Sequence, residues 1–134
     1  MGPRIKNRSL SCIGFEARVV RGVGRPTVVV RGEIDRATVD ELTTALTEAM
    51  VGNSCIEVDL TDATFMDSSG VRALADAYFR LGRLPEAIRL RDPSPALRSL
   101  LVLAGAETLF DVVFSKDRPT LVTERTDREP ARGR

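Results

Sequence analysis

The sequence predicts a single domain of the α/β class, and three observations support this prediction. The chain has 134 residues, 43% of them apolar, which is enough for one hydrophobic core. Two strand-like stretches, residues 13–20 and 27–30, flank a glycine-containing turn and predict a hairpin. Residues 27–60 then show the patterns of strand, helix and strand, an order that predicts a βαβ unit with parallel pairing and a right-handed crossover.

The first two strands differ in their patterns. Apolar and charged residues alternate from position 13 to position 20, and this period of two predicts a half-buried strand. The β-branched run Thr27–Val30 predicts a second strand that is buried on both faces. Residues 31–35 follow just past that strand and place two carboxylates there, Glu33 and Asp35. Taken alone, these are ordinary solvated loop charges.

The first helix and the third strand complete the βαβ unit. Thr38 and Glu41 have the spacing of a capping box, with Thr38 as the N-cap. Apolar residues then follow at helical spacing, and Gly52 closes the helix. Residues 55–60 alternate again and predict the third strand, and residues 61–64 are expected to form the loop that follows it.

A second helix begins directly after the segment Asp67-Ser68-Ser69-Gly70. Ser68 or Ser69 is the predicted N-cap, and Gly82 is the predicted end. The apolar face of this helix is predicted to consist of Val71, Leu74, Ala75, Tyr78 and Leu81. Taken by itself, the segment Asp67-Ser68-Ser69-Gly70 is an ordinary capping turn. A helix start also favours a phosphate, and a serine hydroxyl held there could carry one covalently.

The last part of the domain is expected to hold one further strand and one further helix. Residues 87–90 predict a short fourth strand, and Ser94 followed by Pro95 predicts a helix start that leads to Gly105. Residues 109–114 are compatible with either an edge strand or a hydrophobic return that packs without pairing. The expected domain therefore spans residues 11–114.

Both ends of the chain are polar. Residues 1–10 contain three basic side chains and are expected to form a flexible basic arm. Residues 115–134 are expected to form a disordered polar tail, in which Leu121 and Val122 are the apolar residues most able to contact the domain. The two cysteines, Cys12 and Cys55, lack zinc or CxxC spacing and are predicted to be free thiols.

Composition narrows the classes of function. A formal net charge of +1 gives no general attraction to nucleic acid or to an anionic membrane. The chain has neither a run of 18 apolar residues nor a signal-peptide core, so we expect a soluble, cytoplasmic protein. It has no histidine, and its only lysines are Lys6 and Lys116, so a serine nucleophile would lack a credible base. We therefore expect neither an enzyme nor a bound cofactor or metal; no P-loop is present.

The motifs together resemble the STAS domain of bacterial anti-sigma factor antagonists. The resemblance rests on the order of four segments and covers about two-thirds of the chain: residues 32–35, 58–60, 65–70 and 92–95 before a Leu-rich helix ending in Gly105. No single segment is specific, whereas the ordered set is. The resemblance implies a mixed sheet of four or five strands with helices packed mainly on one face.

The resemblance also implies a partner switch. Such antagonists bind an anti-sigma factor that is itself a serine kinase and thereby release the sigma factor. The kinase uses its own bound ATP to phosphorylate the antagonist, and a serine phosphatase resets it. The phosphoacceptor would be Ser68, the first serine of the motif. The partner-binding face would comprise Glu33, Asp35, Asp62, Asp67, Ser69, Gly70, Val71 and Arg72.

Some alternatives stay open at this point. Arg72 stands where many family members carry a small or apolar residue, and it is either a partner contact or a surface arginine. The chain could also be a STAS scaffold without a sigma-factor connection, such as a stressosome-type subunit or a component of a transporter assembly. The family expectation for the free protein is a monomer.

Overall fold

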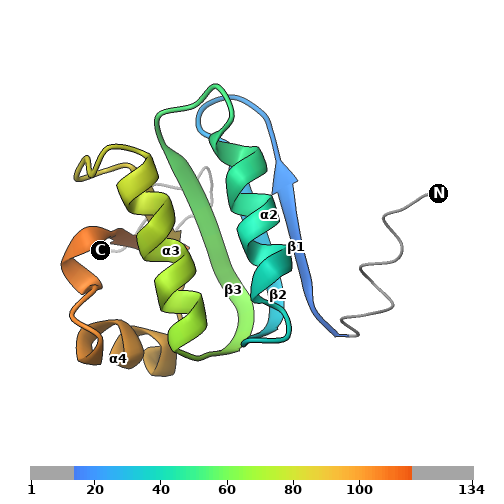
Figure 1. Ribbon diagram of the computed structural model, residues 1–134, viewed down its shortest axis with the longest axis vertical. Coiled ribbons are helices and arrows are strands. Elements are labelled where there is room, and N and C mark those ends of the chain that lie inside the picture. Colours follow the sequence, from blue (N-terminus) through green and yellow to red (C-terminus); the bar gives the residue numbers. More distant parts are fainter. Residues whose placement is uncertain (1–13, 116–134) are drawn as a thin grey trace, which may run out of the picture.

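The computed structural model describes residues 14–115 and has the predicted α/β architecture in one domain (Figure 1). Five strands form one sheet in the order β1-β2-β3-β4-β5, which is also their order along the chain. The elements are β1 Glu16–Val20, β2 Thr27–Ile34, α2 Val39–Met50, β3 Ile56–Met66, α3 Ser68–Arg80, β4 Ile88–Arg91, α4 Pro95–Leu103, the short 3-10 helix η1 Glu107–Leu109, and β5 Asp111–Val113.

The sheet is mixed, as the resemblance implied. β1 pairs with β2 in antiparallel orientation, which confirms the hairpin. β2 with β3, β3 with β4 and β4 with β5 are all parallel pairs, so the parallel pairing predicted for the βαβ unit is also confirmed. Residues 109–114, left open between two interpretations, contain the parallel edge strand β5. The expected arm, residues 1–10, Cys12 and most of the expected tail lie outside the described residues.

The core lies between the sheet and the helices. Figure 1 shows α2 and α3 side by side on one face of the sheet, and both begin at the same end of it. Leu42 and Leu46 of α2, Leu74 of α3 and the inward residues of β2 and β3 are fully or almost fully buried there. The start of α4 is correctly predicted, because Ser94 Oγ accepts a hydrogen bond of 3.2 Å from the Leu97 amide and Pro95 follows as the first helical residue.

Both central strands are longer than predicted. β2 continues to Ile34, and β3 continues through the expected loop at residues 61–64 to Met66. The two strands stay paired beyond Val30 through two register shifts, and long-range pairing of this kind cannot be read from local polarity. The prediction that β2 is buried on both faces is also wrong, because Val28 and Val30 are buried while Val29 between them is only half-buried.

The second face of the sheet carries paired charges. Glu57 of β3 is 3% exposed, and its Oε2 accepts a hydrogen bond from Arg91 of β4. Arg89 Nε lies 3.1 Å from Asp111 Oδ2 on the next strand. Buried carboxylates are stable only when they are paired, so side chains of β3, β4 and β5 together make this polar layer possible.

Gly32 allows β2 to bulge before the strand reaches its last residues. Its φ is +94°, and a Cβ added there would lie 2.2 Å from the Gly14 carbonyl oxygen. Any other residue would therefore suffer both an unfavourable backbone conformation and a clash with rigid backbone. Glu33, Ile34 and Asp35 follow directly, so their placement depends on this glycine.

Substitution at Gly32 is expected to be costly. Gly32→Ala should lower the free energy of unfolding by about 3 kcal/mol, from strain at positive φ and from the clash. Gly24→Ala is the matched control, because Gly24 has a φ of +91° but open space around its Cβ position. It should cost about 1 kcal/mol. Equal losses for the two variants in urea unfolding would show that the contact with Gly14 has no energetic weight.

Candidate functional site

Two turns lie next to each other at the carboxyl edge of the β2–β3 pair. The last residues of the two strands, Ile34 and Met66, are register partners. Asp35 and Asp67 follow them, and the Asp67 amide donates a hydrogen bond of 3.0 Å to the Ile34 carbonyl oxygen. Each turn leads into a helix, so the starts of α2 and α3 are held together at the edge where α/β sheets commonly place their sites.

The first turn is closed by Asp35 and Thr38. Asp35 Oδ1 accepts hydrogen bonds from the amides of Ala37 at 2.9 Å and Thr38 at 3.1 Å. The Thr38 hydroxyl donates to the Glu33 carbonyl oxygen at 2.8 Å and accepts from the Asp35 amide at 2.9 Å. The capping-box prediction is therefore wrong in its chemistry, since Thr38 is the N-cap residue but makes no side-chain cap bond. Its hydroxyl is occupied by the turn.

The second turn is closed by Asp67. This residue, rather than Ser68 or Ser69, is the N-cap of α3, and Oδ1 accepts a hydrogen bond of 2.9 Å from the Ser69 amide. The prediction of a serine cap is wrong by one or two positions, because the chain enters the helix directly from the extended end of β3. Hydrogen bonds from the Ser69 hydroxyl and from the Ser69 and Gly70 amides hold the pKa of Asp67 below its ordinary value of 3.8, against a smaller opposing effect of burial.

The two serines of the motif have different environments. The Ser69 hydroxyl donates a short hydrogen bond to Asp67 Oδ1, and Ser69 is half-buried. Ser68 is the first residue of α3 and is exposed, and its hydroxyl makes no hydrogen bond with another described residue. Ser68 is therefore the accessible hydroxyl at this helix start, and Ser69 is part of the cap.

Gly70 and Val71 support the site from beneath. Gly70 is buried, and a Cβ added to it would lie 2.7 Å from Ile34 Cγ2 and 2.5 Å from Met66 Cγ. Glycine therefore lets the first turn of α3 pack directly on the ends of β2 and β3. Val71 is 8% exposed and belongs to the core. Of the residues expected on the partner-binding face, these two offer almost no side-chain surface.

The remaining candidate residues are not all close to Ser68. Glu33 is exposed near the end of β2, where its register partner is Phe65, and Arg72 is exposed on α3. Asp62 is the register partner of Arg31 in the β2–β3 ladder. It lies four residues before the end of β3, about 13 Å along the strand from Met66. The structure thus brings Asp35, Asp67, Ser68 and Ser69 to one edge and leaves Asp62 away from it.

Two residues near the site were not predicted from the sequence. Arg36 is exposed in the first turn, and its positive charge contributes to the lowered pKa of Asp67. Phe65 is 48% exposed and precedes the second turn by one residue. Arg36 immediately follows Asp35 in the sequence, but its proximity to Asp67 depends on the pairing of β2 with β3.

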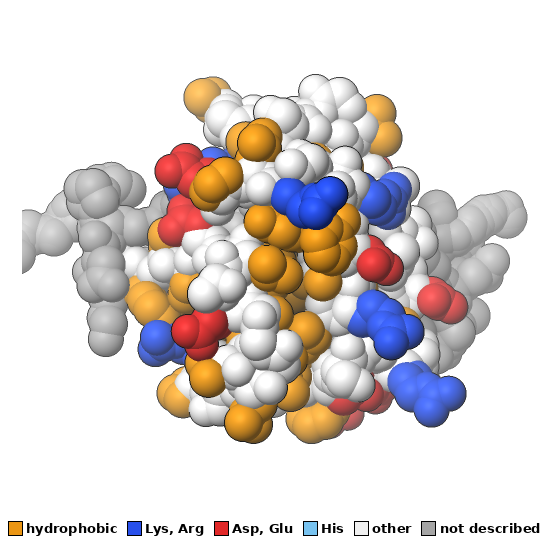
Figure 2. Space-filling model, turned by 60° about the vertical axis from the view of Figure 1, so that its left-hand side comes forward, with side chains coloured by type: hydrophobic (Ala, Val, Ile, Leu, Met, Phe, Trp, Pro, Cys, Tyr) orange, Lys and Arg blue, Asp and Glu red, His pale blue; other side chains and the backbone are white. Residues whose placement is uncertain are grey.

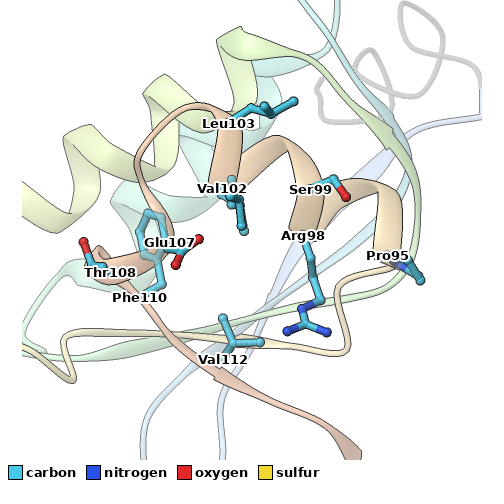
Figure 3. A pocket seen from close by; sticks show the side chains of 10 residues that line it. Pro95, Arg98, Ser99, Val102, Leu103, Glu107, Thr108, Phe110 and Val112 are labelled. Carbon is cyan, nitrogen blue, oxygen red and sulfur yellow. The ribbon is translucent and has the colours of Figure 1, made fainter.

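The candidate residues at the sheet edge are exposed or half-buried, except for Gly70 and Val71 beneath them. A groove of about 870 Å³ is lined by α4, η1 and β5 and includes none of the candidate residues (Figure 3). Hydrophobic side chains form a band on the face shown in Figure 2, bordered by charged side chains.

Within residues 14–115, no three acidic, histidine or cysteine side chains form a metal-binding group, and no helix has the length and apolar character to span a membrane.

Comparison with known families identifies the class of this domain. The family model described as "Mlab, STAS domain" matches residues 17–113. The chain therefore belongs to the STAS domain family, in agreement with the resemblance noted from its motifs. No curated protein sequence matches the chain.

Solved structures with similar folds include several anti-sigma factor antagonists. An antagonist from Mycobacterium paratuberculosis is 27% identical with a TM-score of 0.67, covering 83% of this chain and 92% of that one. The unphosphorylated antagonist SpoIIAA is 25% identical with a TM-score of 0.58, covering 77% and 90%. The phosphorylated form of the Bacillus cell fate determinant SpoIIAA is 25% identical with a TM-score of 0.53, covering 77% and 94%.

The Asp67 cap should contribute to stability in a pH-dependent way. Asp67→Ala removes the acceptor of the Ser69 amide and should cost about 1 kcal/mol at neutral pH. Because the folded-state pKa lies below 3.8, this contribution is complete above pH 3.8 and disappears as the pH falls through the folded-state pKa. Urea unfolding at several pH values measures it. Asp76→Ala on the exposed face of the same helix is the control, and an equal, pH-independent loss in both variants would contradict the assignment.

Proposed function

We propose that this protein is an anti-sigma factor antagonist controlled by phosphorylation of Ser68. The observation that carries the proposal is the exposed hydroxyl of Ser68 at the start of α3, which makes no hydrogen bond within residues 14–115, beside a neighbouring serine whose hydroxyl is held by Asp67. The similarity to anti-sigma factor antagonists, among them SpoIIAA in unphosphorylated and phosphorylated forms, supports it. The partner is an anti-sigma factor that is also a serine kinase, and its release of the sigma factor follows from binding this chain.

The chemistry of the switch needs little from this chain. The Ser68 oxygen attacks the γ-phosphorus of ATP held by the kinase, a bond to that oxygen forms, and the bond to ADP breaks. A base on the kinase takes the hydroxyl proton, since this chain has no histidine and the lowered pKa of Asp67, whose Oδ1 accepts from Ser69, makes that carboxylate a weaker base. A phosphatase restores the hydroxyl by hydrolysis. In this scheme the chain is a substrate and a binding partner, and it is not an enzyme.

Phosphorylation would act through charge. A phosphoserine carries roughly −1.5 to −2 charges at neutral pH, and here it would stand beside Asp67. A partner surface that accepts a neutral hydroxyl at this position would face a doubly charged group instead. Binding is weakened when a charge at an interface faces like charge or is buried without a partner. The fold itself should tolerate the phosphate, because a helix N-terminus stabilises negative charge.

The acceptor residue can be identified directly. The purified protein is incubated with candidate anti-sigma kinases and ATP, and phosphate is located by mass spectrometry. We expect phosphate on Ser68, its loss in Ser68→Ala, and its retention in Ser69→Ala, because the Ser69 hydroxyl is engaged and the Ser69 amide still closes the cap. A tight complex without phosphate on either serine would contradict the switch and favour a non-catalytic STAS scaffold.

The charge mechanism can be tested by mimicry. Ser68→Glu should weaken binding to the anti-sigma factor at least roughly tenfold, whereas the neutral, similarly sized Ser68→Gln should weaken it much less. Both variants should melt within about 3 °C of the wild type, because Ser68 is exposed and makes no hydrogen bond with another described residue. Calorimetric titration and thermal unfolding measure the two effects. Equal losses of affinity for Glu and Gln would show that size, not charge, blocks the partner.

A further inference from the structure

Two exposed arginines stand near Ser68, and neither forms an ion pair with another residue in the range 14–115. Arg72 lies four residues further along α3, and Arg36 lies in the neighbouring turn, where its charge lowers the pKa of Asp67. The arginines that form ion pairs in the described part of the chain are others: Arg18, Arg31, Arg89 and Arg91. Arg72 therefore holds a positive charge close to the proposed acceptor without a partner among these residues.

Helix geometry directs Arg72 toward Ser68. Residues four apart lie on the same face of an α-helix, separated by a rise of about 6 Å. Side chains on a helix also tilt toward its N-terminus, so the position of Arg72 in α3 favours a side chain directed back toward the turn that begins with Ser68. An arginine side chain is long enough to cover this distance, and its planar guanidinium can donate two parallel hydrogen bonds to a phosphate.

Asp76 is the competing partner for Arg72, because it lies four residues beyond it and is exposed. The order of charges decides between the two. An acidic residue followed four positions later by a basic one is more favourable than the reverse order, since it also agrees with the helix dipole. Ser68 bearing a phosphate has the favourable order with Arg72, and the pair Arg72–Asp76 has the unfavourable one.

We propose that Arg72 binds the phosphate on Ser68 and that this contact distinguishes the phosphorylated surface of the chain from the unphosphorylated one. This inference rests on the proposed function, because it assumes that Ser68 carries the phosphate. Before phosphorylation the guanidinium is exposed on the same helix face as the Ser68 hydroxyl. After phosphorylation the guanidinium binds the phosphate. The helix face therefore gains a negative group, and the positive charge of Arg72 is no longer free to contact a partner.

The experiment uses full-length protein with phosphoserine placed at position 68 during translation, so that no kinase is needed. The second pKa of the phosphate is measured by phosphorus NMR at low salt. We expect it to be lower in the protein with Arg72 than in Arg72→Gln, by roughly 0.2 to 0.4 of a unit, because a nearby cation favours the dianion. Arg72→Lys should recover part of the shift, and high salt should reduce it.

Two control variants decide which charge matters. Arg80→Gln removes an arginine twelve residues beyond Ser68 on α3, where its guanidinium contacts Thr47, and should leave the phosphate pKa unchanged. Arg36→Gln should change it less than Arg72→Gln. Identical titrations of wild type and Arg72→Gln, or a shift that depends on Arg36 alone, would overturn the proposal. Failure of every candidate kinase to modify Ser68 would instead count against the proposed function and leave this result standing.

Discussion

The parallel pairing of β2 with β3 is the constraint on which the candidate site depends. The register holds Ile34 against Met66, so the two residues that follow them, Asp35 and Asp67, begin adjacent turns. The hydrogen bond from the Asp67 amide to the Ile34 carbonyl oxygen fixes one turn to the other. Gly70 then lets α3 start directly on the strand ends, because no side chain could fit between them. The exposed position of Ser68 follows from this packing.

The two turns use their aspartates in the same way. Each carboxylate accepts hydrogen bonds from backbone amides two residues on, so both aspartates serve local structure even though they lie at the exposed edge of the sheet. Negative charge at this edge is therefore partly neutralised by amide groups and, for Asp67, by Arg36. A phosphate added to Ser68 would find the Ser69 and Gly70 amides already bonded to Asp67, so exposed arginine side chains would be important partners beside the helix N-terminus.

Local sequence patterns predicted most helices and strands correctly. They failed where pairing between strands distant in the sequence determines the structure. The start of α4 was correct because Ser94 and Pro95 act on their own helix. Thr38 is the N-cap residue as predicted, but the predicted cap bond is missing because its hydroxyl donates to the longer β2. The serine cap was wrong because β3 runs to Met66 and leaves Asp67 at the boundary. Burial of Glu57 was also not predicted, because its partner Arg91 is 34 residues away and on another strand.

The sequence by itself determined the α/β class, the order of strands and helices, and the family, because these depend on periodicity and on motifs within short segments. Tertiary structure alone decided which serine is accessible, which residue caps α3, and which candidate residues share one edge. Those properties depend on side chains from β2, β3 and α3 that are far apart in the chain and are brought together only by strand register and close packing.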